Sequence, residues 1–413
     1  MIQSIDTIII GAGQGGLATS YYLKQQGREH LILEKADQAG SAWRDGRWDS
    51  FTLVTPNWAF RLPGAEYSGE QPAGFLKRDE VVAIFAGYAE KFGLPLRTNT
   101  RVTAVEAAAD GGFLVRTADT TYQARHVVMA TGLFQTPRLP VFAARTPADI
   151  LQLNSDNYRN PSQLPPGGVL VVGSSQSGCQ IAQELHQNGH PVYLCTSGAG
   201  RIPRRYRGRD IFAWAAQMGF SDRTVDQLPN PKAKFAANPH MAGKSDGGSL
   251  NLHQFARDGI RLLGRLQDVQ DGKLQLAGDL HDNLAKADKF EADMLQGIDA
   301  FIAHSGIEAP AETLPQHQHG YAQEIVRELD LAASGIRTII WTIGYQFDFS
   351  MVKFPVFDED GYPIQQRGET VQPGLFFVGL PWLYKQKSGL LAGVGEDAAH
   401  IASRIAAGQT CSA

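Results

Sequence analysis

Two glycine-rich loops in the chain have the residue types and the spacing that suit binding of a nucleotide phosphate. The first reads Gly11-Ala12-Gly13-Gln14-Gly15-Gly16, and Glu34 ends the apolar run that follows. In such a loop the first glycine permits a tight turn, the second lets backbone approach a pyrophosphate, and the last lets helix and strand pack closely. The helix N-terminus offers unpaired N–H groups to the phosphates, and Glu34 can accept hydrogen bonds from a ribose diol. The pattern predicts a dinucleotide site for FAD or NAD, a plain glycine turn being the alternative.

The second loop repeats this pattern with one change. It reads Gly173-Ser174-Ser175-Gln176-Ser177-Gly178, so a serine replaces the middle glycine. We expect the Ser175 side chain to crowd a pyrophosphate slightly and to weaken binding. The alternative is a degenerate strand–helix–strand unit that binds nothing.

Hydroxyl and guanidinium groups, and no acid, follow the second loop's next apolar run. Four of them are the candidates Thr196, Ser197, Arg201 and Arg204. An acid would favour the 2′-hydroxyl of NAD, whereas these groups suit the 2′-phosphate of NADPH. We therefore predict that Arg201 and Arg204 bind that phosphate. The alternative is a solvated basic loop, which is our interpretation of Arg207 and Arg209.

These loops need a strand before them and a helix after them. Short β-branched runs at 5–10 and 168–172 precede them, helical patterns follow, and further strands are expected at 30–33 and 191–195. The predicted fold is α/β with two Rossmann-like dinucleotide-binding domains, the NADPH domain inserted into the FAD domain. The predicted boundaries are 1–135 and 345–413 for the FAD domain, 165–330 for the NADPH domain, and 136–164 and 331–344 for the hinges.

Composition excludes several classes of protein. The 413 residues carry 38 basic and 42 acidic side chains, a net charge of −4, which gives no support for a nucleic-acid or membrane-surface partner. The three cysteines, Cys179, Cys195 and Cys411, are too far apart for a disulfide scaffold, a redox pair or a thiolate zinc site. No signal peptide and no membrane-spanning apolar run is visible, so we expect a cytoplasmic protein. A homodimer is compatible with the sequence.

Several longer motifs resemble those of the class B flavin-containing monooxygenases, bacterial enzymes related to the auxin-synthesising plant monooxygenases. Besides the two loops, the motifs are Gly40-Ser41-Ala42-Trp43-Arg44, Arg47-Trp48-Asp49-Ser50-Phe51-Thr52-Leu53-Val54-Thr55-Pro56-Asn57, Ala130-Thr131-Gly132 and Gly374-Leu375-Phe376-Phe377-Val378-Gly379-Leu380-Pro381-Trp382. The resemblance implies that NADPH reduces FAD, and that dioxygen then forms a C4a-peroxyflavin. One oxygen atom is then transferred to a small organic substrate by N-oxygenation, S-oxygenation or a Baeyer–Villiger reaction.

The same resemblance implies roles for individual residues. Asn57 is the candidate catalytic side chain near the reactive edge of the flavin, and a turn asparagine bonded to its own backbone is the alternative. Trp43 and Arg44 are expected beside FAD, although core packing competes for Trp43. The remaining cofactor-binding candidates lie at strand ends, at the hinges and before the last helix: Lys35, Thr131, Gly132, Gly344 and Gly395.

Departures from the family pattern keep other functions open. The linker histidine of the family is replaced by Asn154 before Tyr158, and the second Ala-Thr-Gly-Tyr motif reads Thr342-Ile343-Gly344-Tyr345. An FAD-dependent NAD(P)H oxidase or reductase that releases hydrogen peroxide is therefore the main alternative, and a redox sensor without turnover is a third. A disulfide reductase is disfavoured because no cysteine pair is placed to face a flavin. The stretch from His281 to His319 looks like an insertion, and we interpret His317-Gln318-His319 as a surface loop with no bound metal.

Overall fold

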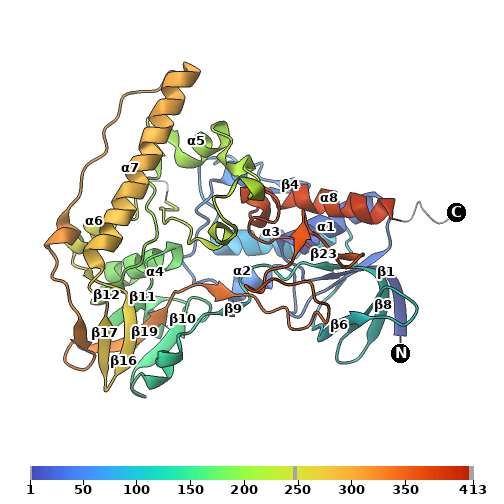
Figure 1. Cartoon of the computed structure of the whole chain (residues 1–413), viewed down its shortest axis with the longest axis horizontal. Coiled ribbons are helices and arrows are strands. Elements are labelled where there is room, and N and C mark those ends of the chain that lie inside the picture. Colours follow the sequence, from blue (N-terminus) through green and yellow to red (C-terminus); the bar gives the residue numbers. More distant parts are fainter. Residues whose placement is uncertain (1, 245–248, 409–413) are drawn as a thin grey trace.

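A mixed sheet and a parallel sheet organise the chain in the computed structural model, which describes residues 2–244 and 249–408 (Figure 1). The first sheet has the order β21-β22-β23-β8-β1-β2-β5, and β7 pairs with both β8 and β6. Its strands are β1 (Ile2–Ile10), β2 (His30–Leu33), β5 (Leu96–Arg97), β6 (Ala104–Ala107), β7 (Phe113–Arg116), β8 (Thr121–Met129), β21 (Gln365–Gln366), β22 (Glu369–Thr370) and β23 (Leu375–Phe377). The order joins strands from both ends of the chain in one sheet.

Strand β1 is buried on both faces because each face of the first sheet is covered. Ile9 packs in a cluster with α1 (Gln14–Gln25), α3 (Arg78–Lys91) and α8 (Val394–Ala407). Ile8 and Ile10 point to the other face, where β7 and residues 347–362 cover them. This alternation explains why the strand reads as a continuous apolar run and not as a half-buried one.

The second sheet is parallel throughout and has the order β10-β19-β11-β12-β15. Its strands are β10 (Leu151–Asn154), β11 (Gly168–Val172), β12 (Val192–Cys195), β15 (Arg261–Leu263) and β19 (Ile336–Trp341). Helices α4 (Gln176–Gln187), α6 (Leu252–Asp258) and the start of α7 (Leu280–Ser305) cover one face. The antiparallel strands β16 (Leu266–Gln270), β17 (Lys273–Leu276) and β18 (Glu328–Asp330) cover the other. Both expected strand–helix–strand units are thus present.

The predicted hinge ranges need a correction. Strands β10 and β19 lie inside 136–164 and 331–344, yet they are members of the second sheet. The two chain crossings pair instead as the short antiparallel ladder of β9 (Thr136–Pro137) and β20 (Tyr345–Gln346), which lies between the two sheets in Figure 1.

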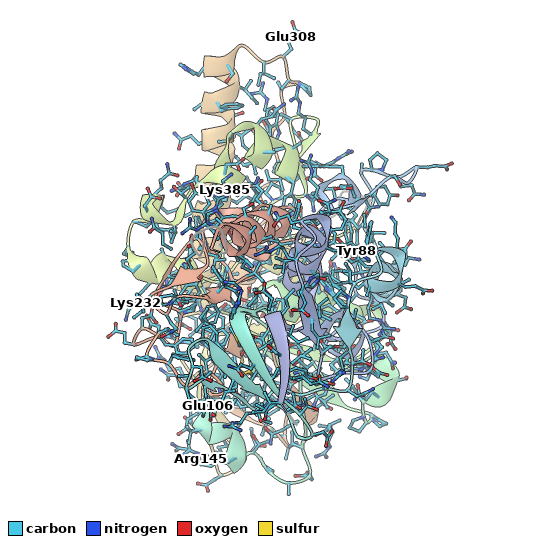
Figure 2. All side chains as sticks on the ribbon, turned by 90° about the vertical axis from the view of Figure 1, so that its right-hand side faces the viewer. Tyr88, Glu106, Arg145, Lys232, Glu308 and Lys385 are labelled. Carbon is cyan, nitrogen blue, oxygen red and sulfur yellow. The ribbon has the colours of Figure 1, made fainter. Side chains whose placement is uncertain are left out.

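The segment predicted as an insertion contains α7, a helix of 26 residues. Its second half leaves the sheet and packs on α5 (Ile211–Gln217) through Ile298, Ile302 and Trp214. Glu308, just beyond the helix, lies at the outermost tip of this projection (Figure 2). Within the described residues, no helix is long and apolar enough to cross a bilayer.

Candidate coenzyme sites

The three motif glycines of the first loop serve different physical needs. Gly11 adopts a φ of +106°, and a Cβ on Gly16 would lie 1.9 Å from the Gly11 carbonyl oxygen, so neither position admits a side chain without rearrangement. Gly13 has φ −84° and ψ −169°, which any residue adopts. Among the described residues, a Cβ there would meet no atom within 4 Å. The structure therefore leaves open space above Gly13, where a pyrophosphate would lie.

Glu34 lies where a ribose-binding acid is expected. It follows β2, is 6% exposed, and its Oε2 accepts a hydrogen bond of 2.7 Å from the Ala12 amide. The Ala36 amide donates to Oε1 at 2.9 Å. These backbone bonds fix the carboxylate against the first loop, while its oxygens retain lone pairs for a diol.

Helices α1 and α8 bring their N-termini to the same place. The side-chain Nε2 of Gln14 donates to the Gly389 carbonyl at 2.7 Å, which joins the first loop to the turn before α8. Neither helix has a side-chain cap bond in the described structure, so backbone N–H groups at both ends are available to a ligand. Gly395, in the first turn of α8, packs on Pro63, since a Cβ there would lie 2.9 Å from the proline ring. Open space, a fixed acid and two helix N-termini fit FAD.

The residues expected to cover FAD lie near this loop with partners of their own. Trp43, on α2 (Ser41–Asp45), is half-buried, with its ring centre 6.1 Å from Phe51 and 6.2 Å from Phe85. Arg44 forms exposed ion pairs with Asp37 at 2.8 Å and Asp45 at 2.7 Å, and Lys35 is exposed. Core packing of Trp43 is thus observed, while contact of these three residues with FAD stays a prediction.

Asn57 is buried and held by backbone groups. Its Oδ1 accepts a hydrogen bond of 2.7 Å from the Leu76 amide, and its Nδ2 donates to the Gln71 carbonyl at 3.0 Å. The side chain thereby fixes residues 71–76, which differs from the predicted alternative of an asparagine bonded to its own turn. The second Nδ2 hydrogen has no hydrogen-bond partner among the described residues, and the catalytic role of Asn57 stays a prediction.

The second loop has the same backbone as the first but a different covering. Ser175 has φ −80° and ψ −167°, nearly the values of Gly13, so a serine is accommodated there without strain. Its hydroxyl donates to the Asn238 carbonyl at 3.0 Å. Gln176 exchanges two hydrogen bonds with the Met241 backbone, at 2.8 and 2.9 Å. We call residues 238–243 the strap, because this segment crosses the second loop.

The other polar residues of the second loop form a small buried network. Ser174 Oγ accepts from the Ser197 amide at 2.9 Å, and the two hydroxyls are 3.4 Å apart. Thr196 donates to the Leu263 carbonyl at 2.8 Å. Ser177 and Gly178 begin α4, and a Cβ on Gly178 would lie 1.8 Å from the Gly173 carbonyl oxygen. The predicted candidates of this loop are therefore brought together at one end of the second sheet.

The two predicted phosphate ligands are not free at this site. Arg204 is 2% exposed and donates to the Val54 carbonyl at 2.7 Å and to Asp210 at 2.5 Å. It joins the two domains, which argues against the predicted contact with a 2′-phosphate. Arg201 lies in the loop after β12, but its guanidinium is paired with Asp288 and Glu291 of α7.

A buried cation at the hinge was not identified from the sequence. The Arg47 guanidinium lies 4.4 Å from the Phe134 ring centre and 5.4 Å from that of Trp43. Burial lowers its pKa, and Tyr345 and Asp156 lie beside it. The Tyr345 hydroxyl donates to Asp156, and burial together with this bond raises the Tyr345 pKa to about 12. Arg47 thus links the FAD domain to both chain crossings, which no local pattern could reveal.

The predicted hinge glycines precede the two strands of the crossings, β9 and β20. Gly132 and Gly344 have φ of +74° and +89°, and a Cβ on either would meet no described atom within 4 Å. The Thr131 hydroxyl accepts from Gln135 at 3.1 Å. The glycines therefore serve the turns of the crossings, and their contact with a coenzyme stays a prediction.

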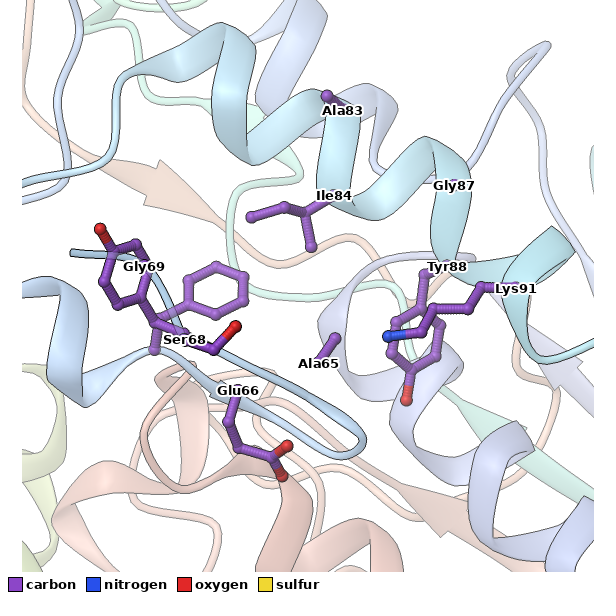
Figure 3. A pocket seen from close by; sticks show the side chains of 11 residues that line it. Ala65, Glu66, Ser68, Gly69, Ala83, Ile84, Gly87, Tyr88 and Lys91 are labelled. Atoms are coloured by element: carbon purple, nitrogen blue, oxygen red, sulfur yellow. The ribbon is translucent and has the colours of Figure 1, made fainter. Parts of the chain in front are cut away.

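A hollow of about 410 Å³ lies elsewhere on the FAD domain, between α3 and the hairpin of β3 (Arg61–Leu62) and β4 (Ala65–Glu66). Ile84 and Tyr88 line it from the helix, and Glu66 and Lys91 stand at its rim (Figure 3). None of the predicted site residues lines it. Elsewhere in the described chain, no group of three or more His, Cys, Asp or Glu side chains is placed to hold a metal.

Two dinucleotide loops on two sheets joined by a double crossing define a flavoprotein oxidoreductase with two nucleotide domains. Residues 8–209 match the model of the pyridine nucleotide-disulphide oxidoreductase family. A Geobacillus kaustophilus protein described as an uncharacterized oxidoreductase, CzcO-like, is 33% identical over 98% of this chain and 99% of its own length. The chain belongs to this CzcO-like family of oxidoreductases.

More distant comparisons confirm the resemblance to class B flavin-containing monooxygenases. Rice indole-3-pyruvate monooxygenase YUCCA1 is 26% identical over 72% of this chain and 76% of its own. A flavin-containing monooxygenase from Stenotrophomonas maltophilia shares the fold, with a TM-score of 0.68 at 19% identity over 98% of this chain and 99% of that one. The chain therefore shares the two-domain fold of a flavin-containing monooxygenase, and the matched family model and this fold imply a flavin and a nicotinamide coenzyme.

Proposed function

We propose that the chain is an FAD-dependent monooxygenase that uses NADPH and dioxygen, forms a C4a-peroxyflavin and transfers one oxygen atom to a small organic substrate. N-oxygenation, S-oxygenation and Baeyer–Villiger oxidation are the reaction types within this proposal. The observation that carries it is the pairing of two loops of the same backbone geometry, one open above Gly13 and one covered by the strap. Such a pair suits a flavin that stays bound at the first loop and a nicotinamide coenzyme that binds and dissociates at the second. A homodimer is part of the proposal but not required by it.

The residues of this chain would bind, orient and protect the cofactor, which supplies the oxygen-transfer chemistry. Glu34 would hold the ribose and the N-terminus of α1 the pyrophosphate. The N-terminus of α8 would stabilise negative charge on the reduced ring system. Arg47, enclosed by aromatic rings, would add a fixed cation at the hinge and keep water out of this side of the site.

The second candidate function is an NAD(P)H oxidase or reductase that releases hydrogen peroxide. The placement of Asn57 favours it, because backbone groups hold both ends of the amide that was expected to act near the flavin. Reduction of a protein disulfide is less compatible with the structure. Cys179 and Cys195 are both buried in the second domain, and burial raises the Cys195 pKa to about 12.

Rapid mixing separates the two candidates. The purified flavoprotein is reduced with NADPH, mixed with oxygenated buffer and followed by its flavin spectrum, while released peroxide is measured in parallel. A persistent oxygenated-flavin spectrum with little peroxide supports the monooxygenase. Immediate return of oxidised flavin with one peroxide per NADPH supports the oxidase, and protein purified without flavin that binds no added FAD would refute both.

A further inference from the structure

The two nucleotide loops obtain their acidic residues in different ways. At the first loop, Glu34 comes directly from the end of β2. At the second, β12 ends at Cys195 and is followed by Thr196 and Ser197, so the strand supplies no acid. An acid at this place in a Rossmann unit contacts the ribose hydroxyls and disfavours a 2′-phosphate. In the structure, two acids of α7 instead pair with Arg201, in the loop that follows β12.

Helix α7 lies along the loop that follows β12. Asn283 donates to the Thr196 hydroxyl at 3.2 Å. A Cβ on Gly198 would lie 3.5 Å from Lys286, and one on Gly200 would lie 2.5 Å from the Phe290 ring. These three contacts follow successive turns of one helix face, and Arg201 extends past that face to reach Asp288 and Glu291.

The guanidinium of Arg201 is neutralised by these two acids. Glu291 Oε2 accepts hydrogen bonds from Nε at 3.1 Å and from Nη2 at 2.5 Å. Asp288 Oδ1 lies 2.8 Å from Nη1, as an ion pair without an aligned hydrogen bond. The Arg201 side chain is only 6% exposed, so solvent screens these pairs weakly.

Asp288 is itself fixed in its charged form. The Tyr321 hydroxyl donates to its Oδ2 at 2.7 Å, and His253 Nε2 lies 3.2 Å from both carboxylate oxygens. Burial alone would raise the pKa of Asp288, but these hydrogen bonds and the charge of Arg201 lower it to about 2. The acid therefore stays ionised at neutral pH.

We propose that Asp288 and Glu291 determine coenzyme specificity: they neutralise Arg201, so that the second site accepts NADH as readily as NADPH. This inference rests on the proposed function, since it requires that the second loop bind a nicotinamide coenzyme. A 2′-phosphate beside Arg201 meets two carboxylates for one guanidinium, which removes the net attraction. A 2′-hydroxyl carries no charge and can donate to either acid, so NADH does not suffer the same repulsion.

Equilibrium binding of NADP⁺ and NAD⁺ to the oxidised holoenzyme tests the proposal without turnover. The unmodified enzyme should bind the two with dissociation constants within about tenfold of each other, or about 1.4 kcal/mol. Glu291→Gln keeps the shape of the side chain and removes one negative charge. It should tighten NADP⁺ binding about tenfold or more and leave NAD⁺ binding nearly unchanged.

Two further variants complete the experiment. Asp293→Asn makes the same charge change on the same helix, where Asp293 pairs with exposed Lys289 at 2.8 Å, and it should change neither constant appreciably. Adding Arg201→Gln to Glu291→Gln should abolish the gain in NADP⁺ affinity. Thermal unfolding of each variant confirms that the comparison is made on folded protein.

Other outcomes are equally informative. A preference for NADP⁺ of more than about a hundredfold in the unmodified enzyme would overturn the proposal. If Lys286→Gln removed that preference, phosphate recognition would belong to the exposed lysine beside Gly198. Equal effects of Glu291→Gln on both coenzymes would also overturn it. If neither nucleotide bound and neither reduced coenzyme reduced the flavin, the proposed function itself would fail.

Discussion

Replacing Gly13 by alanine tests whether glycine is needed there for the free space above the first loop or for the backbone conformation of the loop. The backbone at residue 13, with φ −84° and ψ −169°, admits alanine, and the added Cβ meets no described atom within 4 Å. Two effects on folding oppose each other: alanine lowers the entropy of the unfolded chain, and it is a poorer helix N-cap than glycine. We therefore expect the free energy of unfolding to change by no more than about 1 kcal/mol.

FAD binding should respond much more strongly. The new methyl group points into the space assigned to the pyrophosphate, and overpacking of this kind costs about 1–3 kcal/mol. That cost corresponds to FAD binding weakened by about fivefold to 150-fold. The measurements are the flavin-to-protein ratio after purification and the dissociation constant from fluorescence titration of flavin-depleted protein.

Gly16→Ala is the matched control in the same loop. Its Cβ would lie 1.9 Å from the Gly11 carbonyl oxygen, so this variant should lose thermal stability as well as flavin. Gly13→Ala protein that keeps the FAD affinity of the unmodified chain would refute the assignment of this loop to the pyrophosphate. A loss of stability in Gly13→Ala as large as that in Gly16→Ala would refute the argument that space, and not conformation, selects glycine at residue 13.

Three further variants test the second domain. Burial and the nearby Arg201 guanidinium lower the pKa of His240 to about 3. As pH falls below about 6.5, the unfolded chain binds a proton at this histidine and the folded chain does not. The free energy of unfolding therefore falls by about 2–3 kcal/mol by pH 4.5. His240→Asn should flatten this loss in urea unfolding at pH 7 and 4.5, and an unchanged loss would contradict the linkage. Arg204→Gln removes a buried guanidinium from its 2.5 Å pair with partly exposed Asp210 and should cost about 3–5 kcal/mol of unfolding free energy. A cost below about 1 kcal/mol would exclude the interdomain role. Ser175→Ala removes the hydrogen bond to the Asn238 carbonyl. Amide hydrogen exchange in the strap should become up to about tenfold faster, while the flavin content stays constant. Unchanged exchange would mean that this hydrogen bond does not hold the strap.

The first site could be predicted from the sequence because its parts are close together in the chain. Strand, glycine turn, helix and terminal acid lie within residues 5–34, and each has a local signature. The structure confirms that arrangement, including the end of α1 before Gly27, which has a φ of +65°. The second strand–helix–strand unit was predictable for the same reason.

The partners of Arg201 and Arg204 could not be predicted in this way. The acids that pair with Arg201 belong to α7, far along the chain, and nothing near residue 201 indicates them. The type of residue suggested phosphate binding, but tertiary contacts decide whether a guanidinium is free. The hinge boundaries failed for a similar reason, since β10 and β19 join a sheet only through partners distant in sequence.

The residue at the middle position of each loop, Gly13 or Ser175, relates to how tightly that loop would bind its nucleotide. Gly13 and Ser175 share one backbone conformation, so the difference between them concerns what occupies the adjoining space. At Gly13 the described chain places nothing there, which leaves a cradle for a cofactor that stays bound. At Ser175 the strap already approaches the loop, and a coenzyme must bind alongside protein groups that hold each other in its absence. A ligand that competes with such contacts binds more weakly than one that enters preformed space, so we expect tight binding at the first loop and exchangeable binding at the second.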